Sequence, residues 1–157
     1  MTNVTIGIDI GGTNTVFGVV DRNGKCLAQG NIRTDEYKDI DNYIAALTKA
    51  VNSTLSETNT PVDVKGMGIG APNGNYYNGT IEYAPNLAFK GIVPLGKMIE
   101  KACEAGPVVL TNDANAAALG EMMYGAARGM KNFIMITLGT GLGSGIGCTV
   151  LRAGSGV

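Results

Sequence analysis

Histidine is absent from this chain of 157 residues. The chain therefore cannot form a Ser-His-Asp triad or a Cys-His pair from its own residues, and a general base must be Asp, Glu, Lys, Tyr or Cys. Cysteine is scarce, because only Cys26, Cys103 and Cys148 are present, far apart and without a C-x-x-C motif. We expect these cysteines to be buried free thiols in a reducing cytoplasm.

Long apolar runs and strong charge are also missing. No run approaches the ~18 residues of a membrane-spanning helix, and the N-terminus lacks the basic segment of a signal peptide, so we expect a cytoplasmic protein. The net charge of -1 argues against a nucleic-acid or membrane surface held by bulk charge. The hydrophobic content of 45% is enough for a core, and the length suits one domain of roughly 100–200 residues.

Glycine, by contrast, is plentiful, with 24 residues. Apolar alternation leads into residues 9–14, DIGGTN, and an apolar run leaves them, which predicts a β-hairpin with a glycine turn. Such a turn lets a ligand approach the backbone, and its N–H groups can bind an anion. Asp9 ends the first strand, and a carboxylate beside a phosphate needs a cation between them, which suggests a Mg²⁺ position. A plain hairpin with an exposed Asp is an equal alternative.

A second glycine turn, GTGLGSG, occupies residues 139–145 and follows a predicted strand at 133–138. We expect its returning strand at 146–151. Between the two turns the periodicity predicts alternating strands and helices, and a long polar stretch at 73–89 is more typical of a functional loop than of an idle one. The predicted elements are strands at 25–34, 64–71 and 107–111, helices at 37–55, 94–103 and 116–124, and a small hairpin at Asn78-Gly79.

Three glycines, Gly66, Gly68 and Gly70, fall within one predicted strand and loosely fit the dinucleotide fingerprint. We reject that match, because the fingerprint requires the glycines between a strand and a helix, whereas Pro72-Asn73-Gly74 follows here. A strand with so few side chains instead lets another backbone or a ligand come close.

The strand at 107–111, which we expect to be buried, stops at Asn112-Asp113, and a helix follows. The commoner role of an Asp at this junction is to cap the helix. The alternative is a general base for a hydroxyl nucleophile, with Asn112 binding an adjacent hydroxyl. Two glycine and threonine turns, as clamps on a polyphosphate, together with such a base would suit phosphoryl transfer.

These segments together resemble the ROK family (repressor, open reading frame, kinase), and most of all its bacterial glucokinase-like members. The matching motifs occur in the family's order and extend to about Val150. They are Asp9–Asn14, Gly70-Ala71-Pro72, Pro85-Asn86-Leu87, the sequence NDANAA at 112–117 and the sequence LGTGLG at 138–143.

The resemblance implies an actin-like ATPase, ribonuclease H-like α/β fold, with a mixed sheet that contains an antiparallel meander and is flanked by helices. It also implies transfer of the γ-phosphate of ATP, with Mg²⁺, to a hydroxyl of glucose or a related hexose. Asp113 then matches the catalytic base, and the role of Asn86 comes from the resemblance alone. For the phosphates and Mg²⁺ the resemblance implies Asp9, Gly11, Gly12, Thr13, Asn14, Gly139, Thr140 and Gly141. For the sugar it implies Gly70, Asn86, Asn112 and Asp113.

The features of the family that this sequence lacks are as informative as the motifs that match. The Glu-x-x-His pair, the cysteine-rich zinc loop and the second lobe are missing, and so is the helix-turn-helix of family repressors. We therefore expect residues 1–150 to be the N-terminal lobe of a hexokinase or glucokinase. Residues 151–157 do not resemble the family's continuation, and we expect that a truncation or a frameshift explains this tail. We expect the open face of the lobe to self-associate. The alternatives are a sugar-binding or regulatory lobe and an inactive fragment.

Overall fold

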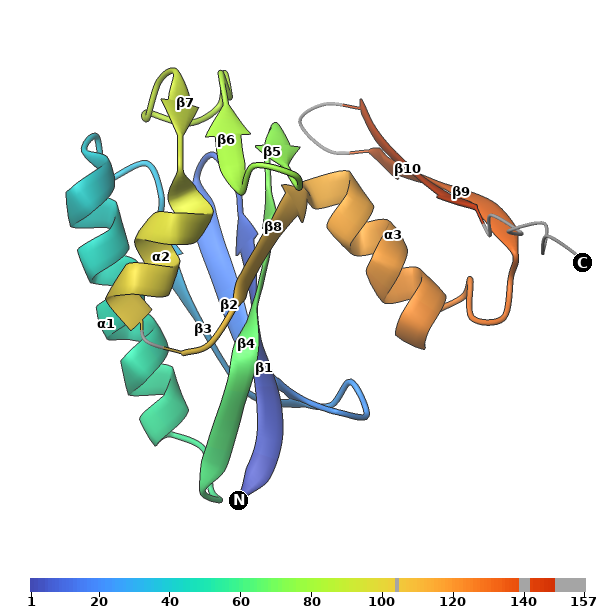
Figure 1. Cartoon of the computed structure of the whole chain (residues 1–157), viewed down its shortest axis with the longest axis horizontal. Coiled ribbons are helices and arrows are strands. Elements are labelled where there is room, and N and C mark those ends of the chain that lie inside the picture. The colour runs from blue at the N-terminus through green and yellow to red at the C-terminus, as the bar shows by residue number, and fades with distance from the viewer. Residues whose placement is uncertain (104, 139–141, 149–157) are drawn as a thin grey trace, which may run out of the picture. The chain divides into compact units, whose positions relative to one another are not determined.

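The computed structural model describes residues 1–103, 105–138 and 142–148 (Figure 1). The chain divides into two compact units, Met1–Asp113 and a second that begins at Ala114. The length alone predicted one domain. The division arises because, in the described part of the second unit, the strands pair with each other and not with the main sheet.

The first unit is built on a five-stranded mixed sheet with the strand order β3-β2-β1-β4-β8. Strands β1, β2 and β3 form the predicted antiparallel meander, while β4 and β8 run parallel to β1. The strands are β1 (Thr2–Ile10), β2 (Asn14–Asp21), β3 (Cys26–Arg33), β4 (Val62–Ala71) and β8 (Val108–Asn112).

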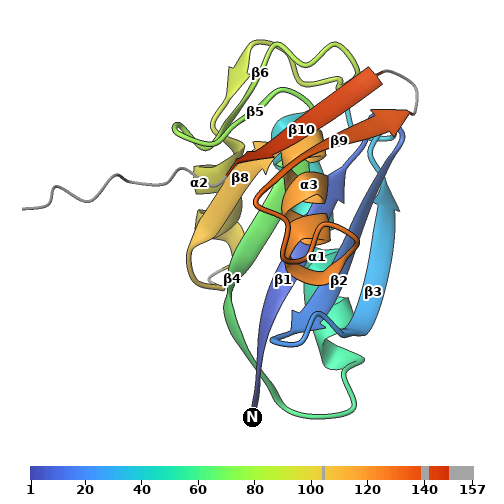
Figure 2. The ribbon, with the colours of Figure 1, turned by 90° about the vertical axis from the view of Figure 1, so that its right-hand side faces the viewer.

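Helices α1 (Ile40–Ser56) and α2 (Leu95–Cys103) cover one face of this sheet (Figures 1 and 2). Strand β1 explains the packing, because Ile6, Ile8 and Ile10 alternate with exposed residues and are buried in the core that both helices share. Helix α1 begins later than the predicted residue 37, because the carboxylate of Asp39 caps it by accepting a hydrogen bond from the amide of Asn42 at 3.0 Å.

The glycine-rich strand β4 has the close backbone approach that the sequence predicts. A Cβ on Gly66 would lie 2.8 Å from the carbonyl oxygen of Pro107, and the φ of Gly66 is +156°. A bulge there shifts the pairing of β4 with β1. The prediction that the strand at 107–111 is buried is only partly right. Strand β8 is the edge of the sheet, and Val109 is 49% exposed.

The polar stretch after β4 forms a small antiparallel sheet of β5 (Gly74–Asn75), β6 (Thr80–Glu82) and β7 (Ile92–Val93). The predicted hairpin at Asn78-Gly79 is confirmed, since the Asn75 side chain accepts hydrogen bonds from the amides of Tyr77 and Asn78. A Cβ on Gly74 would clash with the carbonyl of Thr111. The small sheet therefore lies directly against the end of β8.

The second unit contains most of α3 (Asp113–Tyr124) and a two-stranded ribbon of β9 (Asn132–Leu138) and β10 (Leu142–Cys148). Strand β10 begins four residues before the predicted position 146, and residues 149–151 lie outside the described chain. A Cβ on Gly145 would lie 2.6 Å from Cβ of Ala118, so the ribbon packs closely on α3. Among the ribbon residues whose side chains are described, Ile134, Ile136 and Ile146 are large and exposed.

These isoleucines give the predicted self-association an apolar face within the second unit, and the association itself stays a prediction.

Among residues 1–103, 105–138 and 142–148, no helix is long and apolar enough to span a membrane. The expectation of buried thiols is wrong for Cys26, which is exposed on the edge strand β3, while Cys103 is partly buried.

Candidate functional site

The carboxyl ends of β1, β4 and β8 lie side by side at one end of the sheet. We call this end the site edge, and most of the predicted site residues of the first unit lie there. Asp9 is paired in register with Gly70, and Gly70 with Thr111. Paired residues face the same side of a sheet, so Gly70 leaves the position between Asp9 and Thr111 without a side chain. Open α/β sheets bind ligands at this edge.

Asn112 and Asp113 complete this edge. Asn112 is the last residue of β8, and Asp113 is the first residue of α3. The strand thus passes directly into the helix, as the sequence predicts, although the helix begins three residues earlier than position 116. The first turn of a helix favours acidic side chains, and Asp113 occupies this position.

The first glycine turn joins β1 to β2 at the same edge. The amide of Gly11 donates to the carbonyl of Asn14 at 2.9 Å, and the amide of Thr34 donates to the carbonyl of Thr13 at 2.8 Å. A Cβ on Gly11 would itself lie 2.9 Å from the Asn14 carbonyl oxygen. The predicted hairpin is confirmed, and its first glycine is required by close packing.

The second glycine of the turn lies against the loop that carries Asn86. A Cβ on Gly12 would lie 2.7 Å from the carbonyl oxygen and 3.3 Å from Cβ of Asn86. The ammonium of Lys90 donates to the carbonyl of Leu87 at 2.8 Å, and the Leu87 side chain is buried. Ala84, which precedes Asn86, is also buried, so the loop is held on both sides of its contact with the glycine turn.

The negative charge of Asp113 acts on the carboxyl group of Asp9. Burial raises the pKa of Asp9 above its ordinary value, and the negative charge of Asp113 raises it further. A cation between them would remove this cost. In the described chain no group of three or more His, Cys, Asp or Glu residues could hold a metal. Mg²⁺ typically uses one or two carboxylates together with phosphate oxygens, and Asp9 and Asp113 are two carboxylates whose charges interact.

We expect Asp9→Asn to raise the free energy of unfolding of the metal-free chain at pH 7. The folded pKa of Asp9 lies above the unfolded value, so its ionisation destabilises the fold above the folded pKa, and this cost vanishes below about pH 3.8. Urea unfolding between pH 7 and pH ~3 checks this. Glu100→Gln, at an exposed position within α2, controls for lost charge. A gain that is equal at both pH values would contradict the expectation.

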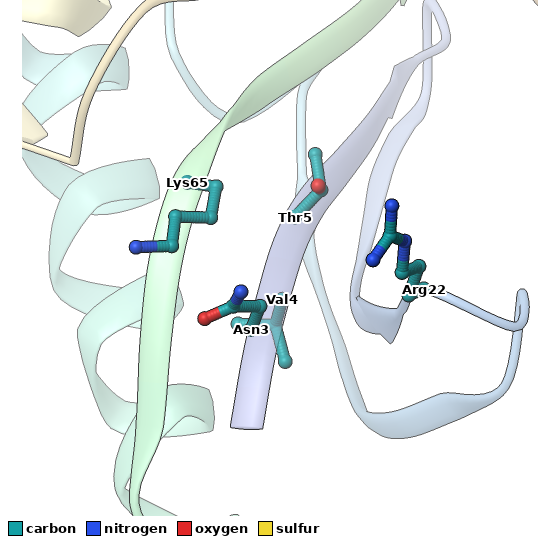
Figure 3. Close-up of a pocket in the computed structure, with 5 residues that line it drawn as sticks. All are labelled: Asn3, Val4, Thr5, Arg22 and Lys65. Atoms are coloured by element: carbon teal, nitrogen blue, oxygen red, sulfur yellow. The ribbon is translucent and has the colours of Figure 1, made fainter. Parts of the chain in front are cut away.

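The second glycine turn, with Gly139, Thr140 and Gly141, lies outside the described residues, so its phosphate role stays a prediction. An open pocket of about 380 Å³ lies at the amino end of β1 and shares no residue with the site (Figure 3). Its lining residues are Asn3, Val4, Thr5, Arg22 and Lys65.

The sequence analysis missed one residue at this edge, Gly74, which it took only as part of a turn. The missing Cβ of Gly74 lets β5 lie against Thr111 and the Asn112 amide. The signal was the glycine itself, but only the tertiary contact shows why the position requires it.

The sequence profile of the ROK family matches residues 5–156. The chain belongs to the ROK family. It is 40% identical over 144 residues to the glucokinase of Streptomyces coelicolor, an alignment that covers 91% of this chain and 43% of that protein. Its fold is the actin-like ATPase fold of ROK sugar kinases.

Solved structures of ROK proteins are also similar to this chain. A ROK glucokinase from Streptomyces griseus in complex with glucose and AMPPNP superposes with a TM-score of 0.76 and 37% identity, covering 92% of this chain and 44% of that one. A ROK transcriptional regulator, a homolog of the E. coli MLC protein, superposes with a TM-score of 0.79 and 25% identity, covering 94% and 37%. The chain therefore spans less than half the length of these relatives.

Proposed function

We propose that this chain is the N-terminal lobe of an ATP-dependent hexokinase of the glucokinase type, formed by residues 1–150. The observation that supports the proposal is the close contact of Gly12 with Asn86, because we assign the glycine turn to the phosphates and the Asn86 loop to the sugar hydroxyls. Asp9 and Asp113 lie at the same edge, close enough for their charges to interact. A transferred phosphate and an accepting hydroxyl must meet in this way.

In this proposal Asp113 accepts the proton of the sugar hydroxyl while that oxygen forms its bond to the γ-phosphorus of ATP. The bond from the γ-phosphorus to the β,γ-bridging oxygen breaks in the same step, and ADP leaves. The backbone at Gly70 and the side chains of Asn86 and Asn112 orient the sugar through its other hydroxyls. The turn at 11–14 binds the phosphates through its N–H groups, with the turn at 139–141 as a second clamp. Asp9 would help to hold Mg²⁺, which would supply charge neutralisation for the phosphates.

A regulatory lobe is the second candidate function, and the similarity to the ROK transcriptional regulator favours it. Such a lobe would bind a sugar at the same residues without transferring phosphate. Downstream gene sequence separates the two at little cost, since a kinase of this family continues into the Glu-x-x-His pair and the zinc cysteines. An inactive fragment would bind neither ligand.

The test is transfer of radiolabelled γ-phosphate from ATP to a panel of hexoses that includes glucose. We expect the 157-residue chain alone to turn over far below the ~1–100 s⁻¹ of typical kinases, because half a cleft leaves the phosphates exposed to water. Turnover in that range by the isolated chain would contradict the proposal that it is one lobe of a larger enzyme. Sugar binding without any transfer by a longer gene product would favour the regulator.

A further inference from the structure

A buried network of three hydroxyl groups lies beside the first glycine turn. The hydroxyl oxygen of Thr15 is 2.8 Å from that of Thr34 and 2.7 Å from that of Tyr43. All three residues are almost fully buried, with exposures of 0%, 2% and 0%. Buried hydroxyls are costly unless they are hydrogen-bonded, so these three groups stabilise one another in a single arrangement.

This network is connected to the glycine turn at two points. Thr15 directly follows Asn14, which accepts the hydrogen bond from the Gly11 amide that closes the turn. Thr34 lies on the other side, and its amide donates to the carbonyl of Thr13 at 2.8 Å. A shift of Thr15 relative to Thr34 would therefore change the backbone of the turn.

The ring of Tyr43 extends the network to the loop that carries Asn86. The ring centroids of Tyr43 and Phe89 are 5.0 Å apart, and Phe89 is itself buried. Phe89 lies three residues after Asn86, which contacts Gly12. Tyr43 thus contacts Thr15, which directly follows the glycine turn, through its hydroxyl and the Asn86 loop through its ring.

We propose that Tyr43 is a positioning residue, which holds the phosphate-binding turn and the Asn86 loop in register so that nucleotide and sugar binding are coupled. This inference rests on the proposed function for its ligands, but its structural part does not. Burial raises the pKa of Tyr43 to about 12. The hydroxyl therefore stays protonated at neutral pH and acts as a fixed hydrogen-bonding group.

The first test needs no ligand. Tyr43→Phe keeps the ring and removes only the hydroxyl, and we expect it to accelerate hydrogen exchange of the Gly11 and Thr34 amides about three- to tenfold, which is the usual worth of one hydrogen bond. Thr48→Val is the matched control, since it removes a hydroxyl on the same helix that is bonded to Cys103 at 3.4 Å. This control should leave both amides unchanged, and Thr15→Ser, which keeps the hydroxyl, should behave as the wild type.

The second test uses ligands. In Tyr43→Phe we expect the affinity for Mg²⁺·AMPPNP to fall about three- to tenfold, and glucose should no longer change it. If the wild-type chain binds neither ligand, the proposed function fails while the exchange result still decides the structural part. Exchange that accelerates equally at all amides, or no more at Gly11 and Thr34 than in Thr48→Val, would overturn the positioning role, because a loss of general stability would explain it.

Discussion

Asp113→Asn is expected to lower kcat about 10²–10⁴-fold in a catalytically active protein that contains this chain, the usual worth of general base catalysis. Asn has the same shape as Asp at the junction of β8 and α3, so the fold and the KM for ATP should change little. The amide, however, cannot accept the proton of the sugar hydroxyl. Steady-state kinetics and a thermal unfolding curve measure the two effects separately.

Asp113→Asn should also change the pKa of the neighbouring Asp9 carboxyl group, which can be measured separately. Because Asp113 is the lesser cause of the raised pKa of Asp9, after burial, the pKa of Asp9 should fall only part of the way toward its ordinary value. An NMR titration of the Asp9 carboxyl carbon follows this change. An unchanged kcat together with a lowered Asp9 pKa would mean that Asp113 acts on the charge of the site and is not the base.

Gly12→Ala is expected to weaken the binding of both sugar and nucleotide, each by about tenfold. The added methyl group would lie 2.7 Å from the backbone carbonyl oxygen of Asn86, so the turn and the loop must move apart. Forcing an atom into a packed contact costs about 1–3 kcal/mol, and about 1.4 kcal/mol corresponds to a tenfold change in affinity. Calorimetric titration with glucose and with Mg²⁺·AMPPNP measures both.

Gly7→Ala is the matched control for this substitution. Gly7 lies on the same strand that leads into the turn, and a Cβ there meets nothing within 4 Å. We expect it to leave both affinities unchanged. Full binding of both ligands by Gly12→Ala would show that the contact with Asn86 is not part of the binding site, whereas equal losses in both variants would indicate general misfolding.

Local sequence patterns were sufficient for the elements that carry such patterns. The alternation of Ile6, Ile8 and Ile10 predicts β1 and its buried face, and the helical spacing of Tyr43, Leu47 and Val51 predicts α1. Strand β7 was missed because two residues cannot show a period. The exposure of Val109 was missed because the position of β8 at the sheet edge follows from the order of strands, which no local pattern encodes.

In the candidate site too, residues with a local sequence signal were predicted and contacts between distant segments were not. Asp9, the glycine turn and Asp113 were identified from their chemistry and the order of motifs, and the structure gathers them at one edge. The contact between Gly12 and Asn86 joins residues 74 positions apart, so no spacing rule could reveal it. Tyr43 was taken only as an apolar residue of a helix face, because its hydroxyl partners come from two other segments.

The most direct test of the central claim, that one edge of this chain binds both a hexose and a triphosphate, is an NMR titration of the 157-residue chain with glucose and then with Mg²⁺·AMPPNP. We expect weak binding, on the order of 1 mM, because one lobe supplies only part of the contacts. Glucose should shift the amide signals of Gly70, Asn86 and Asn112, and the nucleotide those of residues 11–14. Shifts confined to other parts of the chain, or none at saturating ligand, would contradict the account.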